Sequence, residues 1–156
     1  MELINEKNAL WDHEKERIVG EAKEGTFDMG DLKYGETLFQ EWWKLIDEHK
    51  RIIGFGWVHK EEDDFEISVA VDKEHQGNGA GSFILGELEG IAKQLGFHQV
   101  IGIIKSTNQE ATEVIEWLYR NGYVAYWPGF QGSEPKNQHV AFNIVKKCDL
   151  TLTKNI

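Results

Sequence analysis

The sequence has little cysteine, proline and basic charge, and each shortage excludes a class of protein. The single cysteine, Cys148, cannot form an internal disulfide, which argues against a disulfide-stapled secreted domain. Both prolines lie in one late segment, so no proline-rich linker divides the chain. No run approaches the roughly 18 apolar residues of a membrane helix, and the start lacks the features of a secretion signal. We expect one domain over residues 1–156, located in the cytoplasm.

The charge balance argues against nucleic acid and anionic membranes as partners. The chain has 27 acidic and 17 basic residues, a net charge of −10, whereas affinity for phosphate backbones comes largely from lysine and arginine. Acidic residues concentrate in the first 31 positions and at 61–66, which fits either attraction of a cationic substrate or ordinary solubility. The six histidines show no ligand spacing, so we predict no metal site.

Two periodicities organise the first half of the chain. Segments 41–46, 51–59 and 65–71 read as three strands joined by polar turns, and in the third strand Phe65 and Ile67 alternate with Glu66 and Ser68. These segments predict an antiparallel meander. Upstream, the apolar spacing over 9–24 predicts an amphipathic helix.

The second half alternates between helices and strands. Apolar residues spaced 4, 3 and 4 predict a helix over 82–95, with Glu89 and Lys93 as an outward ion pair and Gly96 as its end. A buried strand follows at 100–104, where Gly102 marks a bulge or a close approach.

Beyond that strand, Thr107 and Glu110 have capping-box spacing and predict a second helix, which ends at Gly122. Segments 123–127 and 139–147 then read as two further strands. The order of elements predicts an α/β fold, a mixed sheet with helices packed on it.

Glycines stand on alternate positions between the strand ending near Val71 and the helix beginning near Ser82. Gly77, Gly79 and Gly81 lack side chains, so main-chain N–H groups can approach a bulky anion closely. The first N–H groups and the dipole of the following helix also favour negative charge. This pattern predicts a phosphate cradle, with a simple connecting turn as the alternative.

Two familiar phosphate-binding loops do not fit this segment. The P-loop needs Gly-Lys followed by Ser or Thr, and no lysine occurs between Lys73 and Lys93. The dinucleotide fingerprint would require its third glycine at Ser82 and an acidic residue where the next strand ends in Lys105.

The spacing Gln-x-x-Gly-x-Gly, formed by Gln76, Gly79 and Gly81, resembles the acyl-CoA pyrophosphate loop of the GNAT superfamily of N-acetyltransferases. The resemblance extends over residues 41–146. It implies a central, mostly antiparallel sheet that splays between its fourth and fifth strands and is flanked by helices. It also implies acetyl-CoA as the cofactor, with the pantetheine arm inserted between the splayed strands like an extra strand.

By position, the resemblance implies a set of cofactor-binding residues. They lie on the strand that ends near Val71, on the glycine loop that follows it, and at the start of the helix that ends at Gly122. They are Val69, Ala70, Val71, Gln76, Gly77, Asn78, Gly79, Ala80, Gly81, Ser82 and Asn108. Asn108 precedes Gly122 by fourteen residues rather than the usual eleven, so an ordinary cap residue is the alternative there.

Direct acyl transfer needs a base, an oxyanion donor and an acid. N–H groups around Val69–Val71 are the implied oxyanion donors, and Glu66 is our candidate base, ahead of His59. Tyr119 is the candidate acid, although it stands three residues before Gly122 where many relatives have a tyrosine four before.

The sequence thus predicts an acetyl-CoA-dependent N-acetyltransferase that acts on a primary amine of a small molecule or peptide. The acidic charge favours a small cation such as a polyamine or amino sugar, while an amino acid or a protein amino group stays open. Trp127 and Phe130 are candidates for the acceptor wall. The rival hypothesis is an acyl-CoA-binding module without turnover. The protein could also form a homodimer, which the sequence leaves open.

Overall fold

In the computed structural model, which describes residues 1–126 and 138–156, the strands form one seven-stranded sheet ordered β1-β2-β3-β4-β5-β7-β6. The strands are β1 (Glu2–Glu6), β2 (Glu41–Ile46), β3 (Ile52–Glu61), β4 (Asp64–Val71), β5 (Gln99–Ile104), β6 (Val124–Ala125) and β7 (Leu150–Asn155). The predicted meander is β2-β3-β4, and the expected mixed α/β fold is confirmed.

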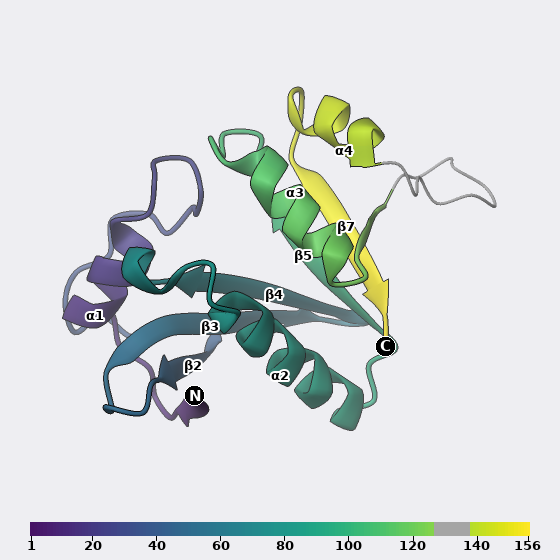
Figure 1. Cartoon of the computed structure of the whole chain (residues 1–156). Coiled ribbons are helices and arrows are strands. Elements are labelled where there is room, and N and C mark those ends of the chain that lie inside the picture. Colours follow the sequence, from purple (N-terminus) through teal and green to yellow (C-terminus); the bar gives the residue numbers. More distant parts are fainter. Residues whose placement is uncertain (127–137) are drawn as a thin grey trace.

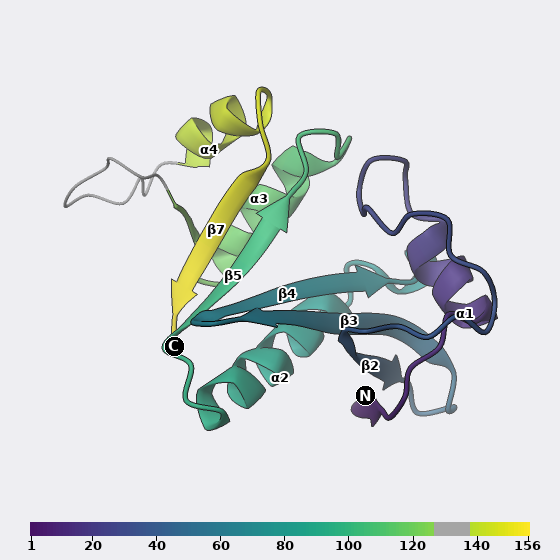
Figure 2. The same cartoon turned by 180° about the vertical axis from the view of Figure 1, so that it is seen from behind.

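The sheet opens into a V between β4 and β5. These two strands are the parallel pair in an otherwise antiparallel sheet, and their register consists of the single pair Glu66 and Ile101. Figures 1 and 2 show that the strands diverge from a shared end, β4 running beside β3 of the meander and β5 running beside β7. The splay expected between the fourth and fifth strands is therefore confirmed.

Helices α2 (Ala80–Gln94) and α3 (Ala111–Arg120) lie on the same side of the sheet, one over each arm of the V (Figure 1). Gly54 and Gly56 of β3 allow α2 to pack closely. A Cβ at Gly56 would lie 2.6 Å from Ile84 Cγ2 and 2.8 Å from Leu88 Cδ1 of that helix. Ile84 and Leu88 are fully buried there.

The opposite face of the meander carries a second core, centred on aromatic residues of β2 and β3. Trp42 stacks on Trp57 with ring centroids 4.5 Å apart, and both pack with Phe55. The buried ammonium of Lys15 lies over the Trp42 and Phe55 rings and pairs with Glu6 at 2.7 Å.

The helix expected over 9–24 is much shorter than its pattern suggested. It consists of α1 (His13–Lys15) and a π-helical turn, η1 (Glu16–Gly20). Asp12 caps it by accepting from Lys15 N at 2.8 Å, and residues 9–11 instead run beside 35–38. The strand β1, at the sheet edge, was not predicted because its polar sequence shows little alternation.

The end of the chain differs from the prediction in two places. Residues 139–147 were expected as a strand, but 138–145 form the helix α4 (Gln138–Val145), which buries Ala141 and Val145 at helical spacing. The closing strand is β7, in which Leu150 and Leu152 alternate with threonines. Of the strand expected at 123–127, only Val124–Ala125 is one within the described residues.

Three local predictions are also wrong. Thr107 Oγ1 donates to Gly25 O rather than capping α3, whose cap residue Glu110 is instead bonded through its N–H to Asn108 Oδ1. Of the two expectations at Gly102, the bulge is wrong, because Gly102 lies in a regular stretch of the β5–β7 ladder, whereas a close approach stays a prediction. Leu95, the last of the apolar residues spaced 4, 3 and 4 and expected to share the face of Ile84 and Leu88, is 55% exposed.

Glu89 does not pair outward with Lys93 as expected, but connects the two arms of the V. Its carboxylate accepts from the Tyr123 hydroxyl at 2.8 Å and from Lys154 Nζ at 3.1 Å. Burial, reinforced by the charge of Glu89, raises the pKa of Tyr123 above its ordinary value. Because α2 belongs to the meander and β7 to the other arm, this cluster joins the two halves below the opening.

We expect Tyr123→Phe to lower the free energy of unfolding by about 2 kcal/mol, since the partly buried carboxylate of Glu89 loses one charge-assisted hydrogen bond. Urea unfolding measures it. The control is Tyr126→Phe, the same change on an exposed side chain, with an expected effect within about 0.5 kcal/mol. Equal effects of the two changes would contradict a role for the buried hydroxyl.

Candidate active site

The open side of β4 offers unpaired main-chain groups to the V. Asp72 N donates to Ile53 O of β3 at 2.9 Å. Because successive residues of a strand direct their main-chain groups to opposite sides, Ala70 also faces β3, while Val69 and Val71 face β5. Beyond the pair at Glu66 and Ile101, β5 has moved out of reach. The N–H of Val69 and that of Val71 are thus the groups presented to the gap.

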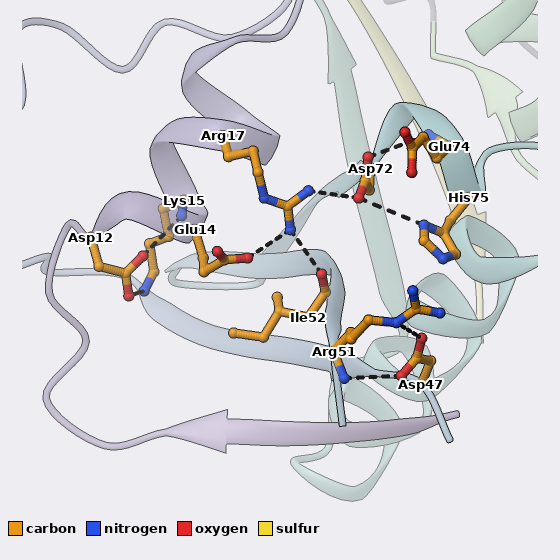
Figure 3. Close-up of polar contacts among 10 residues, drawn as sticks. All are labelled: Asp12, Glu14, Lys15, Arg17, Asp47, Arg51, Ile52, Asp72, Glu74 and His75. Carbon is orange, nitrogen blue, oxygen red and sulfur yellow. Dashed lines mark hydrogen bonds and ion pairs between the residues drawn. The ribbon is translucent and has the colours of Figure 1, made fainter. Parts of the chain in front are cut away.

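The end of β4 is fixed by an ion-pair network with η1. Arg17 Nη1 lies 2.6 Å from Asp72 Oδ2, and Arg17 Nη2 donates to Ile52 O at 3.0 Å and to Glu14 (Figure 3). Burial opposes ionisation of Asp72, but the bonds from Arg17 and Glu74 N–H prevail and hold its pKa below the ordinary value. The strand end and the start of the glycine loop are therefore held rigidly against the meander.

Gln76 joins the glycine loop to this strand end. The loop follows the short turn η2 (Lys73–His75), and Gln76 Nε2 donates to Val71 O at 3.1 Å. Val71 O is one of the main-chain groups on the open side of β4. The first residue of the predicted motif thus positions the loop through its side chain.

The loop adopts the conformation that glycine permits. Gly77 and Gly79 have φ of +84° and +82°, and a Cβ at either would meet open space. Gly79 is the N-cap of α2, so the N–H groups of Ala80, Gly81 and Ser82 have no acceptor within the helix. These donors and the positive end of the helix dipole lie at the same end of α2, which favours binding of a phosphate there.

Gly81 contributes in another way, by allowing α3 to pack closely on the start of α2. A Cβ there would lie 3.3 Å from Trp117 Cζ2 of α3, and Trp117 Nε1 donates to Ser82 Oγ at 2.9 Å. Ser82 Oγ also accepts from Asn121 Nδ2 at 3.4 Å, which leaves its own hydroxyl hydrogen to donate.

A cavity of about 670 Å³ lies between the glycine loop and α3. Seven of the predicted cofactor-binding residues line it: Val69, Val71, Gln76, Gly77, Gly79, Gly81 and Ser82. The other four, Ala70, Asn78, Ala80 and Asn108, do not. Asn78 is exposed, Ala80 is buried in the core, and Ala70 directs its main chain toward β3.

An inner crevice of about 150 Å³ continues the site between the diverging strands. Ser68 and Val69 line it from β4 and Ile101–Ile104 from β5, with Asn108 at its edge. Trp117 and Val114 line both this crevice and the larger cavity, so the two spaces adjoin along α3.

Residues 23–28, which we name the strap, cross the mouth of the crevice and were not part of the predicted site. Gly25 O accepts from Thr107 Oγ1 at 2.8 Å, and Lys23 Nζ lies 2.9 Å from Glu110 Oε1. Phe27, which belongs to the strap, lines the crevice and packs edge-on against Trp57. Gly25 has φ of +86°, and a Cβ there would overlap Thr107 O, so this crossing requires glycine.

Glu66 lies at the closed end of the V, opposite His59 on β3 and beside Ile101 on β5. Burial raises the pKa of Glu66 above its ordinary value, and the nearby His59 only partly opposes the rise. A carboxylate with a raised pKa is a better proton acceptor near neutral pH.

Tyr119 is not brought to the crevice. Its hydroxyl accepts from Ala125 N at 3.2 Å, and its ring packs with the core beneath α3. One helical position turns a side chain by about 100°, so Leu118 faces the crevice in its place. Trp127 and Phe130, the predicted acceptor wall, lie outside the described residues.

No group of three or more His, Cys, Asp or Glu side chains in residues 1–126 and 138–156 is arranged to hold a metal ion. Over the same residues, every helix is too short or too polar to cross a membrane.

A family model for the acetyltransferase (GNAT) family matches residues 7–123, three quarters of the chain. The chain belongs to this family. Its activity class is therefore acyl transfer from acetyl-CoA, as the loop and the splayed strands indicated. Among curated proteins, none matches the sequence.

Solved structures of several acetyltransferases share the fold. An acetyl-CoA complex of phosphinothricin acetyltransferase from Sinorhizobium meliloti is 20% identical, with a TM-score of 0.54 over 75% of this chain and 61% of that one. Ribosomal-protein-alanine N-acetyltransferase from Brucella melitensis is 18% identical, with a TM-score of 0.53 over 75% and 69%. N-acetylglutamate synthase from Neisseria gonorrhoeae is 15% identical, with a TM-score of 0.65 over 99% of this chain and 35% of that one.

The residues present fit coenzyme A. The loop can accept a diphosphate because its donors are free and a Cβ would face open space at Gly77 and Gly79. The unpaired edge of β4 can bond an extended amide-containing arm such as pantetheine.

We expect Gly79→Glu to raise the dissociation constant of coenzyme A at least about tenfold, because a carboxylate then occupies the cradle and repels the diphosphate. Isothermal titration measures it. Gly96→Glu is the matched control, since Gly96 also has positive φ (+90°) and an open Cβ position but lies at the other end of α2. Unchanged affinity in Gly79→Glu would mean that the phosphates bind elsewhere.

We expect Gly25→Ala to release the strap, because the new methyl group collides with Thr107 O. Tryptic cleavage after Lys23 should accelerate about tenfold, which corresponds to a loss of about 1.4 kcal/mol of local stability. Mass spectrometry of timed digests follows it. Gly30→Ala, with positive φ (+65°) but open surroundings, should change little. Equal rates in the two variants would show that the strap is held by other contacts.

Proposed function

We propose that this acetyltransferase transfers an acetyl group directly from acetyl-CoA to a primary amine of a small molecule or peptide. The observation that carries the proposal is the junction of two spaces along α3, a loop-lined cavity and a narrow crevice between β4 and β5. A thioester held through its phosphates in the cavity would place its acyl group in the crevice.

Acetyl-CoA supplies the activated acyl group, and residues of β4 supply the proposed oxyanion donor and base. The N–H of Val69 faces the gap and can donate to the carbonyl oxygen as charge develops there. Glu66 is the proposed base, directly or through an ordered water, because its raised pKa favours proton uptake. We do not assign the acid to Tyr119, whose hydroxyl is bonded to Ala125 N.

A small cationic amine is the acceptor class that the charges support best. Beneath the strap, a second cavity of about 350 Å³ is lined by Glu16, Glu24, Asp28 and Asp31, with Lys23 as its basic residue. The three similar structures are named for different acceptors, phosphinothricin, a ribosomal-protein alanine and glutamate, so their likeness does not select one.

We further propose that residues 1–156 form a single domain, which the inclusion of both β1 and β7 in one sheet supports. A cytoplasmic location, a homodimer and the lack of a nucleic-acid partner stay predictions from the sequence.

Release of free thiol from acetyl-CoA, followed over a panel of polyamines, amino sugars, amino acids and peptides, tests the function. Turnover with at least one amine is the expected result. Tight binding of acetyl-CoA without turnover across the panel would favour the rival binding module.

We expect Glu66→Gln to reduce kcat at least about tenfold, since it removes a general base. In the wild type, activity should fall as the pH drops through the pKa of Glu66, at a pH above the ordinary 4.5 because that pKa is raised. The Gln variant should lack this acidic limb. Glu87→Gln, on an exposed position of α2, is the control and should leave the pH profile intact. An unaltered profile in Glu66→Gln would remove Glu66 from the mechanism.

A further inference from the structure

The cavity between the glycine loop and α3 contains few cations for a ligand as negatively charged as coenzyme A. Its charged lining residues are Glu110, Glu113 and Arg120, all at the start of or on α3. The two carboxylates repel phosphate, and the whole chain has a net charge of −10. Arg120 is thus the cation that lines this cavity among the described residues.

Arg120 occupies a defined position relative to the loop. It follows Trp117 by three residues, so the two side chains lie on the same face of α3. Trp117 Nε1 bonds Ser82 Oγ, and Asn121, the next residue, bonds the same oxygen. Arg120 therefore stands beside the Ser82 side of the loop, across the cavity from the crevice mouth at Glu110.

The guanidinium of Arg120 is available for a ligand. Arg120 is exposed, and within the described part of the chain its side chain has no carboxylate partner, in contrast to Arg17 and Arg51. A planar guanidinium that keeps its charge at all physiological pH values suits bidentate binding of a phosphate monoester.

We propose that Arg120 binds the 3′-phosphate of coenzyme A. The inference rests on the proposed use of the glycine loop for the diphosphate, whose charge is met by main-chain N–H groups of residues 77–82. The remaining phosphate of the cofactor lies on its ribose, beyond the diphosphate and away from the pantetheine arm. A site for it must therefore lie past the loop, and Arg120 is the cation at that place.

Isothermal titration of coenzyme A and of 3′-dephospho-coenzyme A tests the proposal by comparing two ligands that differ by one phosphate. We expect Arg120→Gln to raise the dissociation constant of coenzyme A about tenfold and that of the dephospho form less than about twofold. Arg120→Lys should retain part of the preference, since it keeps the charge but loses the bidentate geometry.

Lys93→Gln is the matched control, because it removes the same charge from an exposed position near the other end of α2, about 20 Å along the helix from Ala80 at the glycine loop. It should leave both dissociation constants within about twofold of wild type. Unchanged affinity for the dephospho form in Arg120→Gln also shows that the variant is folded.

Two results would overturn the assignment. Equal weakening of both ligands would place Arg120 at the diphosphate or in a general electrostatic role, and no change in either would place the 3′-phosphate elsewhere. Failure of the wild type to bind either ligand is a different result, because it would overturn the proposed function itself.

Discussion

The separation of β4 from β5 after a single residue pair is the constraint on which the rest of the structure depends. Two parallel strands that stayed paired would satisfy each other's main-chain groups and leave nothing for a ligand. Here the pairing ends at Glu66 and Ile101, and Val69 and Val71 retain N–H donors toward the gap, while Val71 O accepts from Gln76. The sheet thus carries a vacant strand position within its own plane, which an extended amide chain can occupy.

Contacts on both sides of this opening keep its geometry fixed. Arg17 and Asp72 hold the end of β4, and Gln76 ties the loop to it. On the other arm, Trp117 packs on Gly81 and aligns α3 with the start of α2. Below the opening, the cluster of Glu89, Tyr123 and Lys154 stops the arms from spreading further. The phosphate cradle and the crevice are therefore held at a constant distance, which direct transfer requires.

Local patterns predicted the meander, α2, β5 and the loop because each of these has its own periodicity or glycine signature. Residues 139–147 misled because apolar residues on alternate positions suggest a strand, while the four-residue spacing of Ala141 and Val145 decides the outcome once α4 packs on α3. The predicted ion pair between Glu89 and Lys93 was wrong for a related reason. Helical spacing places Lys93 beside Glu89, but Tyr123 and Lys154, which are 34 and 65 residues away in the sequence, bond to Glu89 instead in its partly buried position. The strap was beyond prediction, since nothing local in residues 23–28 indicates Thr107.

Hydrogen exchange with and without coenzyme A, read by mass spectrometry, tests the central claim most directly. The N–H groups of Val69 and Val71 and those of residues 77–82 are the donors assigned to the ligand. The account predicts that the ligand slows exchange at these positions while β2 and β3 exchange as before. If the ligand bound and left them unprotected, with slowing at other parts of the chain, the vacant strand position would not be the binding site.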